Sequence, residues 1–360
     1  MRKSLQIGGA YIGLIVGAGF ASGQEILQFF TSYGIWGIAG TVIATILFAL
    51  VGMRLAQLGS RLQTASHKDV IYHICGKSVG QAVDVIITLC VFGVTIVMVA
   101  AAGAVFEQQF GLEKHLGSLI IVAVTILSVV LHPQMIITLV GSFTPAILLV
   151  VFVLGGYSLY TMDGTVVGQL SLAEKEVSAS SHWLLSAFLY ASYNIAAGAA
   201  MLAVMGGSVK KEKVAVWGGA IGGIGLGVLI LLINVSMIAK MEVVSGSPMP
   251  MLLIAKIISP WFGLIMAFVL LGLIYNTAVG MLYAFCARLM NPKKRRFNVY
   301  VIIFGIIAFF LSYADFTTLV STLYPVMGYL GFLLIGSIFI SWIKKRVPER
   351  KITTPTKRST

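Results

Sequence analysis

The chain has 360 residues, of which 58% are apolar and only 10% are charged, whereas soluble domains carry about 25% charged residues. Because its mean hydropathy is +0.98, the chain cannot cover itself with polar surface, and most of its solvent must be lipid. This composition excludes a soluble enzyme, a nucleic-acid binder and a secreted disulfide scaffold. Cys75, Cys90 and Cys286 are far apart in the sequence, and their spacing indicates neither a metal centre nor a disulfide framework.

Apolar segments long enough to cross a bilayer, which needs about 20 residues per helix, follow one another along the whole chain. They are residues 5–31, 35–58, 83–107, 116–132, 136–161, 183–207, 214–239, 260–288, 297–313 and 318–343. Between them, the sequence predicts an inside helix or loop at 62–82 and an external loop with a short helix at 240–259. We therefore expect an all-α membrane protein with ten transmembrane helices.

The net charge of +13 is explained by the positions of the basic residues. If the N-terminus lies in the cytoplasm, 21 of the 25 Lys and Arg fall on that same side, as the positive-inside rule predicts. The basic run Lys293–Arg296 then meets anionic lipid rather than nucleic acid. The tail 344–360 is also basic, and we expect it to be a disordered cytoplasmic segment.

An internal repeat relates the fifth and tenth segments at an offset of 180 residues. They share seven identities in nineteen positions, from the Thr138–Val140 and Thr318–Val320 triplets through Pro145 and Pro325 to Gly156 and Gly336. With five helices per half, the second half must be inverted relative to the first. The predicted organisation is a first repeat at 1–161, an external loop at 162–182 and an inverted second repeat at 183–343.

The first segment carries the sequence GAGFASGQE at residues 17–25, in the middle of the membrane. Glycines let the backbone leave helical geometry, and peptide groups freed in this way are tolerated only where they line a cavity or hold a ligand. Freed amides suit a carboxylate, and freed carbonyls suit a hard cation such as Na⁺. The alternative is close packing of the glycines against neighbouring helices.

Glu25 is the one acidic residue deep within a predicted span. An ionisable group at that depth costs at least about 2.5–3.5 kcal/mol to insert, so it is a functional candidate by default. It would carry a proton or pair with a substrate amine. The alternative is a carboxyl group solvated near an outer vestibule.

Polar residues also interrupt three other segments. The sixth contains YASYNIAAGA from Tyr190, which predicts a second broken helix framing a small ligand, or else an interhelical hydrogen-bond patch. The eighth contains Tyr275, Asn276 and Thr277, whose oxygens would complete a cation shell. In the third, Phe92 would belong to a far wall of the site, and in the seventh, a small-xxx-small series of glycines predicts close helix contact.

With these features, the chain resembles the amino acid–polyamine–organocation transporter superfamily, which has the LeuT-type fold of ten helices in two inverted repeats of five. Its Gly17–Phe20 segment is similar to the glycine motif of the first helix of that superfamily. More narrowly, the opening GAYIGLIVGAGFASGQEI resembles that of the YkvI-like membrane proteins. The resemblance implies a location in the bacterial plasma membrane and no enzymatic activity.

The motifs and the resemblance together assign the site. We expect the substrate at Gly17, Ala18, Gly19, Phe20, Gln24, Glu25, Phe92, Tyr190, Tyr193 and Asn194. The resemblance implies a sodium site made by Gly19, Ser22, Asn276 and Thr277.

The expected function is secondary active transport of a small organic solute, an amino acid or an amine, by alternating access. Sodium is the expected coupling ion and no other cofactor is expected, whereas proton coupling through Glu25 is the alternative. A ligand-sensing receptor subunit of the same fold, as in spore germination, is the rival class. A channel is less favoured because no ring of charge appears.

Overall fold

The computed structural model describes residues 2–63, 67–131, 144–162, 164–292, 294 and 296–343, and every regular element in these ranges is a helix. The first half contains α1 (Arg2–Ile15), α2 (Ala18–Ser22), α3 (Gln24–Phe29), the 3₁₀ helix η1 (Thr31–Tyr33), α4 (Ile35–Leu62), α5 (His67–Phe110), α6 (Lys114–Leu131) and α8 (Thr144–Tyr160). The second half contains α9 (Val166–Ala173), α10 (Trp183–Gly207), α11 (Glu212–Ala239), α12 (Met241–Val244), α13 (Pro250–Ile258), α14 (Pro260–Leu289), α15 (Arg296–Leu311) and α16 (Phe316–Ile343).

Among the described residues, six helices are both long and apolar enough to cross a membrane: α4, α6, α11, α14, the Gly80–Phe110 part of α5 and the Phe316–Ile340 part of α16. Helix α10 meets the same test as two arms, Trp183–Ala199 and Met201–Gly207, which meet at 53°. Helices α8 and α15 are apolar but shorter. The chain is therefore a multi-pass membrane protein. The Thr138–Val140 triplet of the internal repeat and the predicted tail at 344–360 lie outside the described residues.

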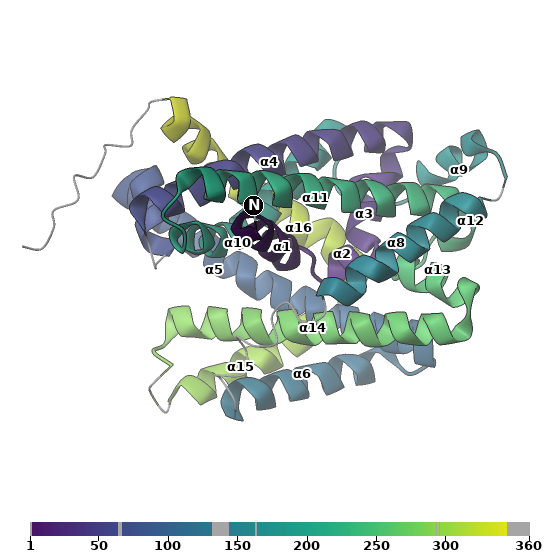
Figure 1. Ribbon diagram of the computed structural model, residues 1–360. Coiled ribbons are helices and arrows are strands. Elements are labelled where there is room, and N and C mark those ends of the chain that lie inside the picture. The colour runs from purple at the N-terminus through teal and green to yellow at the C-terminus, as the bar shows by residue number, and fades with distance from the viewer. Residues whose placement is uncertain are drawn as a thin grey trace, which may run out of the picture.

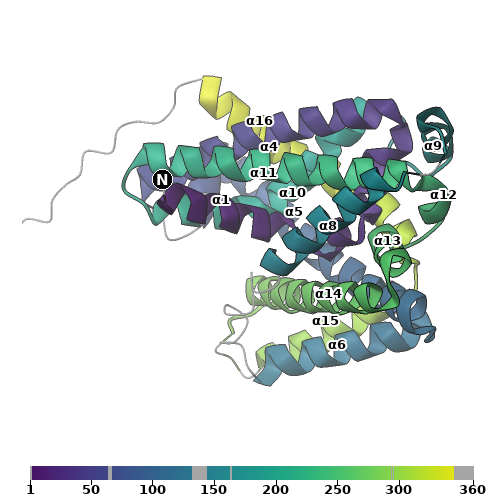
Figure 2. The same ribbon diagram turned by 45° about the vertical axis from the view of Figure 1, so that its right-hand side comes forward.

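The helices form two groups that lie side by side (Figures 1 and 2). In the first group, α4 packs against α10 and α11, and α1 packs against α11. In the second group, α5 packs against α6 and α14, and α15 packs against α6. Helix α16 contacts both α10 of the first group and α5 of the second, so the two groups meet along α5, α10 and α16.

Glycines bring three helices of the first group close together. A Cβ at Gly219 or Gly223 of α11 would collide with the backbone of α4 near Gly52 and Ala49. A Cβ at Gly222, one turn along the same helix, would collide with Tyr11 of α1. The small-xxx-small series therefore provides close helix contact, as predicted.

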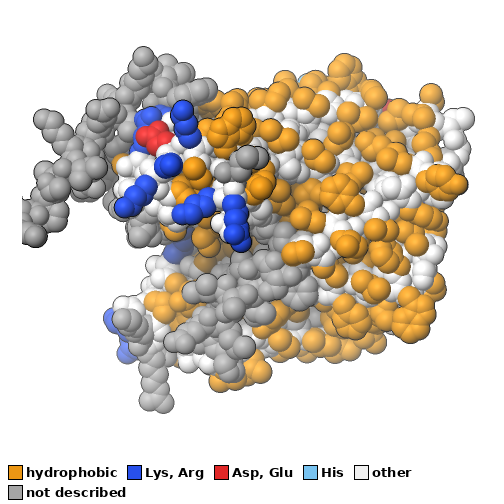
Figure 3. Space-filling view, in the orientation of Figure 1, with side chains coloured by type: hydrophobic (Ala, Val, Ile, Leu, Met, Phe, Trp, Pro, Cys, Tyr) orange, Lys and Arg blue, Asp and Glu red, His pale blue; other side chains and the backbone are white. Residues whose placement is uncertain are grey.

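The surface shows where the membrane lies. In the space-filling view, hydrophobic side chains cover most of the visible face, and Lys and Arg gather at the end near the N-terminus (Figure 3). We call this the basic end; its exposed basic residues are Arg2, Lys3, Arg61, Lys210, Lys211, Lys213, Lys294 and Arg296. The apolar belt is the surface that lipid covers.

Candidate functional site

The chain leaves helical geometry twice within the first predicted span. Helix α1 ends at Ile15, and Gly17 is extended, with φ −93° and ψ −174°. After the single turn of α2, Gly23 takes a left-handed conformation with φ +86°. A side chain is excluded at Gly23 by this φ value and by Met251 and Met237, with which a Cβ would collide.

These interruptions leave backbone groups without partners. The Gly17 N–H donates to Ile15 O at 2.8 Å instead of continuing the helix. As a result, no described residue donates to the carbonyls of Gly13, Leu14 and Val16. Likewise, no described residue accepts from the N–H groups that open α2, those of Ala18, Gly19 and Phe20. Such groups are costly in a membrane interior unless a ligand or water satisfies them.

The carboxylate of Glu25 lies directly beside this unpaired backbone. Its side chain is buried, and its Oε2 accepts a hydrogen bond of 2.6 Å from the Tyr193 hydroxyl of α10. A Cβ at Gly19 would occupy the place that Glu25 Oε1 fills. Gly19 is therefore the residue that lets the Glu25 carboxylate approach the break.

Aromatic rings surround the Glu25–Tyr193 pair. Tyr193 stacks on Tyr324 of α16, with ring centroids 4.7 Å apart. Tyr190, one turn earlier on α10, packs edge-on against Phe30 at 4.9 Å, and its buried hydroxyl faces Glu25, as does that of Tyr324. Three tyrosine hydroxyls therefore surround the Glu25 carboxylate, and that of Tyr193 makes the 2.6 Å hydrogen bond.

A cavity of about 290 Å³ lies between the two helix groups at this point. We call it the solute cavity. It is lined by Gly13 to Gly17, Gly19 and Glu25, by Ile87, Val91, Val94 and Met98 of α5, by Tyr193, Asn194, Ala197 and Met201 of α10, by Leu273, Asn276, Thr277, Gly280, Met281, Ala284 and Arg288 of α14, and by Tyr324. Its size is close to the lower limit of ligand pockets, roughly 300–1,000 Å³, and suits a small solute.

The solute cavity extends toward the basic end. Its lining runs along α14 from Leu273 to Arg288, a helical rise of about 22 Å. Arg288 stands at the far end of this lining, where it donates to Asp84 Oδ1 of α5 at 2.6 Å. The polar floor of the cavity at Glu25 is thus separated by an apolar passage from the charged pair at its end.

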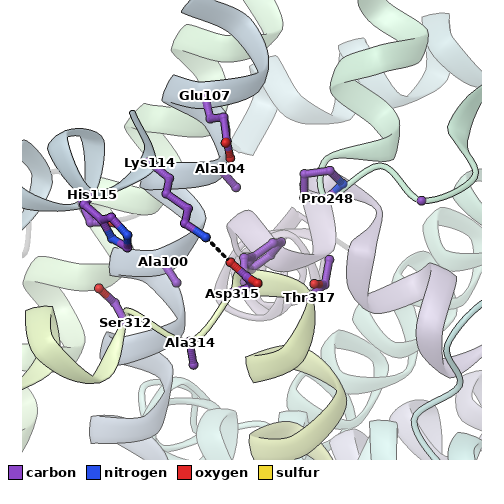
Figure 4. Close-up of a pocket in the computed structure, with 13 residues that line it drawn as sticks. Ala100, Ala104, Glu107, Lys114, His115, Pro248, Ser312, Ala314, Asp315 and Thr317 are labelled. Carbon is purple, nitrogen blue, oxygen red and sulfur yellow. Dashed lines mark hydrogen bonds and ion pairs between the residues drawn. The ribbon is translucent and has the colours of Figure 1, made fainter. Parts of the chain in front are cut away.

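At the opposite end lies a smaller recess of about 180 Å³. Lys114 of α6 and Asp315, which precedes α16, form an ion pair of 2.5 Å across it (Figure 4). Thr317 also lines this recess, and its carbonyl accepts a hydrogen bond of 2.9 Å from Gln28 Nε2 of α3. Because Gln28 lies one turn beyond Glu25, this bond ties α3 to α16 between the solute cavity and the recess.

Half of the predicted substrate residues line the solute cavity: Gly17, Gly19, Glu25, Tyr193 and Asn194. The structure places Ala18, Phe20, Gln24, Tyr190 and Phe92 outside its lining. Ala18, Phe20, Gln24 and Tyr190 are buried in the core around the break. Phe92 stacks instead on Phe285 of α14, with ring centroids 4.5 Å apart, because α5 is rotated relative to the expected face.

Three of the four predicted sodium ligands, Gly19, Asn276 and Thr277, line the solute cavity, but Ser22 does not. The Ser22 hydroxyl donates to Gly19 O at 2.8 Å and accepts from Gln24 N at 3.3 Å. The Gly19 carbonyl and the Ser22 hydroxyl therefore satisfy each other. The unpaired carbonyls lie earlier in the chain, at the end of α1.

The sixth predicted span is not unwound where its polar residues cluster. Helix α10 is regular from Tyr190 to Asn194, and its 53° bend comes after Ala199. The polar side chains bond without opening the helix: Asn194 Nδ2 donates to Tyr190 O at 3.0 Å, and Ser192 Oγ donates to Gly328 O of α16 at 2.8 Å. Ser192 therefore joins α10 to α16, whereas Tyr193 and Asn194 line the solute cavity from a regular helix.

Several lining residues have little that marks them in the sequence. Tyr324 precedes Pro325 within an apolar helix, and this polar ring beside a proline is its only signal. Ile87, Val91, Val94 and Met98 repeat at intervals of four, three and four, which defines one face of α5. In a helix apolar on all sides, this face has no chemical distinction from its neighbours.

Two curated proteins are similar to this chain over most of its length. No family model matches the chain. It is 27% identical over 349 residues to the uncharacterized membrane protein YkvI of Bacillus subtilis (strain 168), covering 96% of this chain and 97% of YkvI. It is also 27% identical over 330 residues to the uncharacterized protein YyaD of the same organism, covering 91% of this chain and 94% of YyaD.

Solved structures share its fold. The structure of MhsT in complex with L-phenylalanine matches with a TM-score of 0.63 at 15% identity, over 94% of this chain and 88% of MhsT. Mhp1 in an inward-facing conformation matches at 0.58 and 14%, over 96% and 78% of the two chains. A manganese transporter of Eremococcus coleocola matches at 0.59 and 13%, over 93% and 77%. The resemblance to the LeuT-type fold is therefore confirmed, and these neighbours are transporters, not enzymes.

Proposed function

We propose that this protein is a secondary active transporter of a small organic solute, working by alternating access. The observation that carries the proposal is the meeting of unpaired backbone groups and the buried Glu25 carboxylate at the floor of the solute cavity. Both are costly inside a membrane, and a bound solute would offset that cost. The LeuT-type fold supports the same conclusion, because its binding sites lie at such helix interruptions.

The solute we propose is an amino acid or another small amine. An ammonium group would pair with the Glu25 carboxylate, which Tyr193 orients through its 2.6 Å hydrogen bond. The stacked rings of Tyr193 and Tyr324 would add cation–π attraction. The apolar wall of α5 would receive the rest of the molecule.

The coupling ion we propose is sodium, held between the end of α1 and α14. Gly13, Val16, Asn276 and Thr277 all line the cavity, and no described residue donates to the carbonyls of Gly13 and Val16. Neutral oxygens of this kind suit a hard cation. In this proposal, the carbonyls of Gly13 and Val16 take the place of Gly19 and Ser22 among the sodium ligands expected from the sequence. Proton coupling through Glu25 remains the alternative, because that carboxylate could carry a proton across the same site.

For the architecture, we propose ten spans in two inverted repeats of five, at 1–161 and 183–343, with both termini and the basic tail in the cytoplasm of a bacterial cell. Positive charge at the basic end supports this orientation. The solute cavity, which runs toward Arg288, would then open to the cytoplasm. The Gln28–Thr317 bond would close the external side in this conformation.

A ligand screen followed by transport assays tests the proposal. Thermal unfolding of the purified protein would be followed with each amino acid and amine, with and without Na⁺, because a ligand of the native state raises the unfolding temperature. Compounds that stabilise the protein would then be measured for uptake into proteoliposomes under an imposed sodium or proton gradient. Uptake driven by the sodium gradient is expected. Loss of proton-driven uptake in Glu25→Gln would instead support proton coupling, and uptake with neither gradient would reject coupled transport.

A further inference from the structure

A second cavity lies on the outer face of the molecule, between α4, α11 and α16. Its volume is about 190 Å³, and its lining combines Arg54 and Gln57 with six apolar residues: Leu50, Val51, Met53, Val216, Ile338 and Phe339. We call it the Arg54 groove. Exposed apolar side chains flank it, including Trp217 and Ile340, whose exposed fractions are 64% and 54%. The groove therefore opens to lipid rather than to the interior of the protein.

The groove lies at one boundary of the hydrocarbon layer. Trp36 of α4 stacks on Trp183 with ring centroids 5.5 Å apart, and exposed tryptophans concentrate at membrane interfaces. Arg54 follows Trp36 by eighteen residues on the same helix, a rise of about 27 Å, close to the roughly 30 Å thickness of the hydrocarbon layer. Arg54 thus reaches the level of lipid headgroups at the basic end.

The Arg54 guanidinium has N–H donors that no described residue accepts. Its Nη1 donates to Gln57 Oε1 at 2.9 Å, and Gln57 in turn donates to Glu212 at 3.1 Å. The nearby carboxylate of Glu212 is paired with Arg61 at 2.8 Å, and no described carboxylate forms an ion pair with Arg54. Its buried Nε has no hydrogen-bond partner in the described part of the chain. The groove therefore holds a guanidinium that Gln57 positions but that forms no ion pair with a described carboxylate.

We propose that the Arg54 groove binds the phosphate of an anionic phospholipid, with the acyl chains lying over Leu50, Val216 and Phe339. A guanidinium fork matches the geometry of phosphate oxygens, and basic pockets between helices on the cytoplasmic side of a membrane bind such headgroups. The lipid would contact α4, α11 and α16 at once. It would therefore connect α16, which contacts both helix groups, to the first group.

Native mass spectrometry of the purified, delipidated protein tests this inference. Dioleoylphosphatidylglycerol is the lipid probe, dioleoylphosphatidylcholine is the zwitterionic comparison, and inorganic phosphate is the free anion. We expect retention of the anionic lipid over the zwitterionic one. Arg54→Gln should weaken that retention by about tenfold or more, because it removes the charge-assisted hydrogen bonds to the phosphate.

The matched control is Lys213→Gln, which removes the same charge from an exposed position at the basic end outside the groove. It should retain the lipid as the unmodified protein does. Val216→Trp fills the groove while leaving Arg54 in place, so it should also lose the lipid and covers the case in which Arg54→Gln does not fold. Equal retention in Arg54→Gln and Lys213→Gln would overturn the inference. Competition by inorganic phosphate as strong as that by the lipid would also overturn it, since the site would then recognise a free anion.

Discussion

At the scale of single residues, the Glu25–Tyr193 pair lies at the centre of the proposed site. Glu25 is buried in a membrane protein, where it accepts the 2.6 Å hydrogen bond from Tyr193 and also faces the hydroxyls of Tyr324 and Tyr190. Removing one partner of a buried charged pair costs more than the bond itself contributes, because the remaining group stays desolvated. The behaviour of this pair should therefore separate a binding site from a structural contact.

Tyr193→Phe should raise the solute concentration needed for half-maximal uptake by about tenfold or more, since a hydrogen bond to a charged group contributes roughly 1.5–3 kcal/mol. Tyr11→Phe is the matched control: it removes an equally buried hydroxyl whose hydrogen bond, to the Phe48 carbonyl, lies outside the solute cavity. That variant should transport as the unmodified protein does. The comparison requires concentration-dependent uptake in proteoliposomes, and equal effects of the two changes would contradict the assignment.

Two glycines at the break make a second comparison. Gly19→Ala would place a methyl group where the Glu25 carboxylate lies, so the carboxylate must move and solute affinity should fall by about tenfold or more, as in Tyr193→Phe. At Gly17, a Cβ would meet the Thr277 hydroxyl at an ordinary 3.9 Å, and the backbone angles there suit alanine. Gly17→Ala should keep its affinity within about threefold, well under 1 kcal/mol. Ligand-induced thermal stabilisation measures both, and a tolerated Gly19→Ala would show that Glu25 has no fixed role.

At the scale of helices, six of the ten predicted segments match described helices long and apolar enough to cross a membrane, and a seventh matches the two arms of α10. Apolar length is a sequence signal of this kind because the thickness of the membrane sets it. The sequence did not predict which face of each helix meets the site. It could not predict the rotation of α5, because that helix is apolar on all sides, and so Phe92 was placed in the site that Val91 and Val94 line. It also placed an unwound turn at Tyr190–Asn194, since a polar cluster that bonds to α16 has the same composition as one that opens a helix.

The solute cavity between the end of α1 and the middle of α14 carries the proposal for the coupling ion. Thr277→Val keeps the shape of the side chain and removes one oxygen from the proposed sodium shell. It should raise the sodium concentration for half-maximal uptake by about fivefold or more, equivalent to roughly 1 kcal/mol. Thr125→Val on α6 removes a buried hydroxyl that has no partner among the described residues and should leave sodium dependence unchanged. An unchanged sodium dependence in Thr277→Val would remove α14 from the ion site.

At the scale of the whole molecule, the solute cavity of about 290 Å³ extends toward the basic end, and the recess of about 180 Å³ lies at the opposite end. The proposed orientation makes a direct prediction about access. In a background lacking Cys75, Cys90 and Cys286, Ala284→Cys in the solute cavity should react with a membrane-impermeant maleimide from the cytoplasmic side. Ala314→Cys in the recess should react from the outside. The two sides are compared in inverted vesicles and whole cells, and the reverse pattern would contradict the orientation.

The central claim is that the solute occupies the cavity between the two helix groups, and Gly280 gives the most direct access to it. A Cβ at Gly280 meets no atom within 4 Å and points into cavity space, and a Cβ at Gly336 of α16 is equally free but lies outside the lining. The decisive measurement is uptake of a radiolabelled amino-acid and amine mixture by proteoliposomes containing Gly280→Leu or Gly336→Leu. We predict that Gly280→Leu folds but loses uptake, whereas Gly336→Leu retains it. Undiminished uptake by Gly280→Leu would contradict the account.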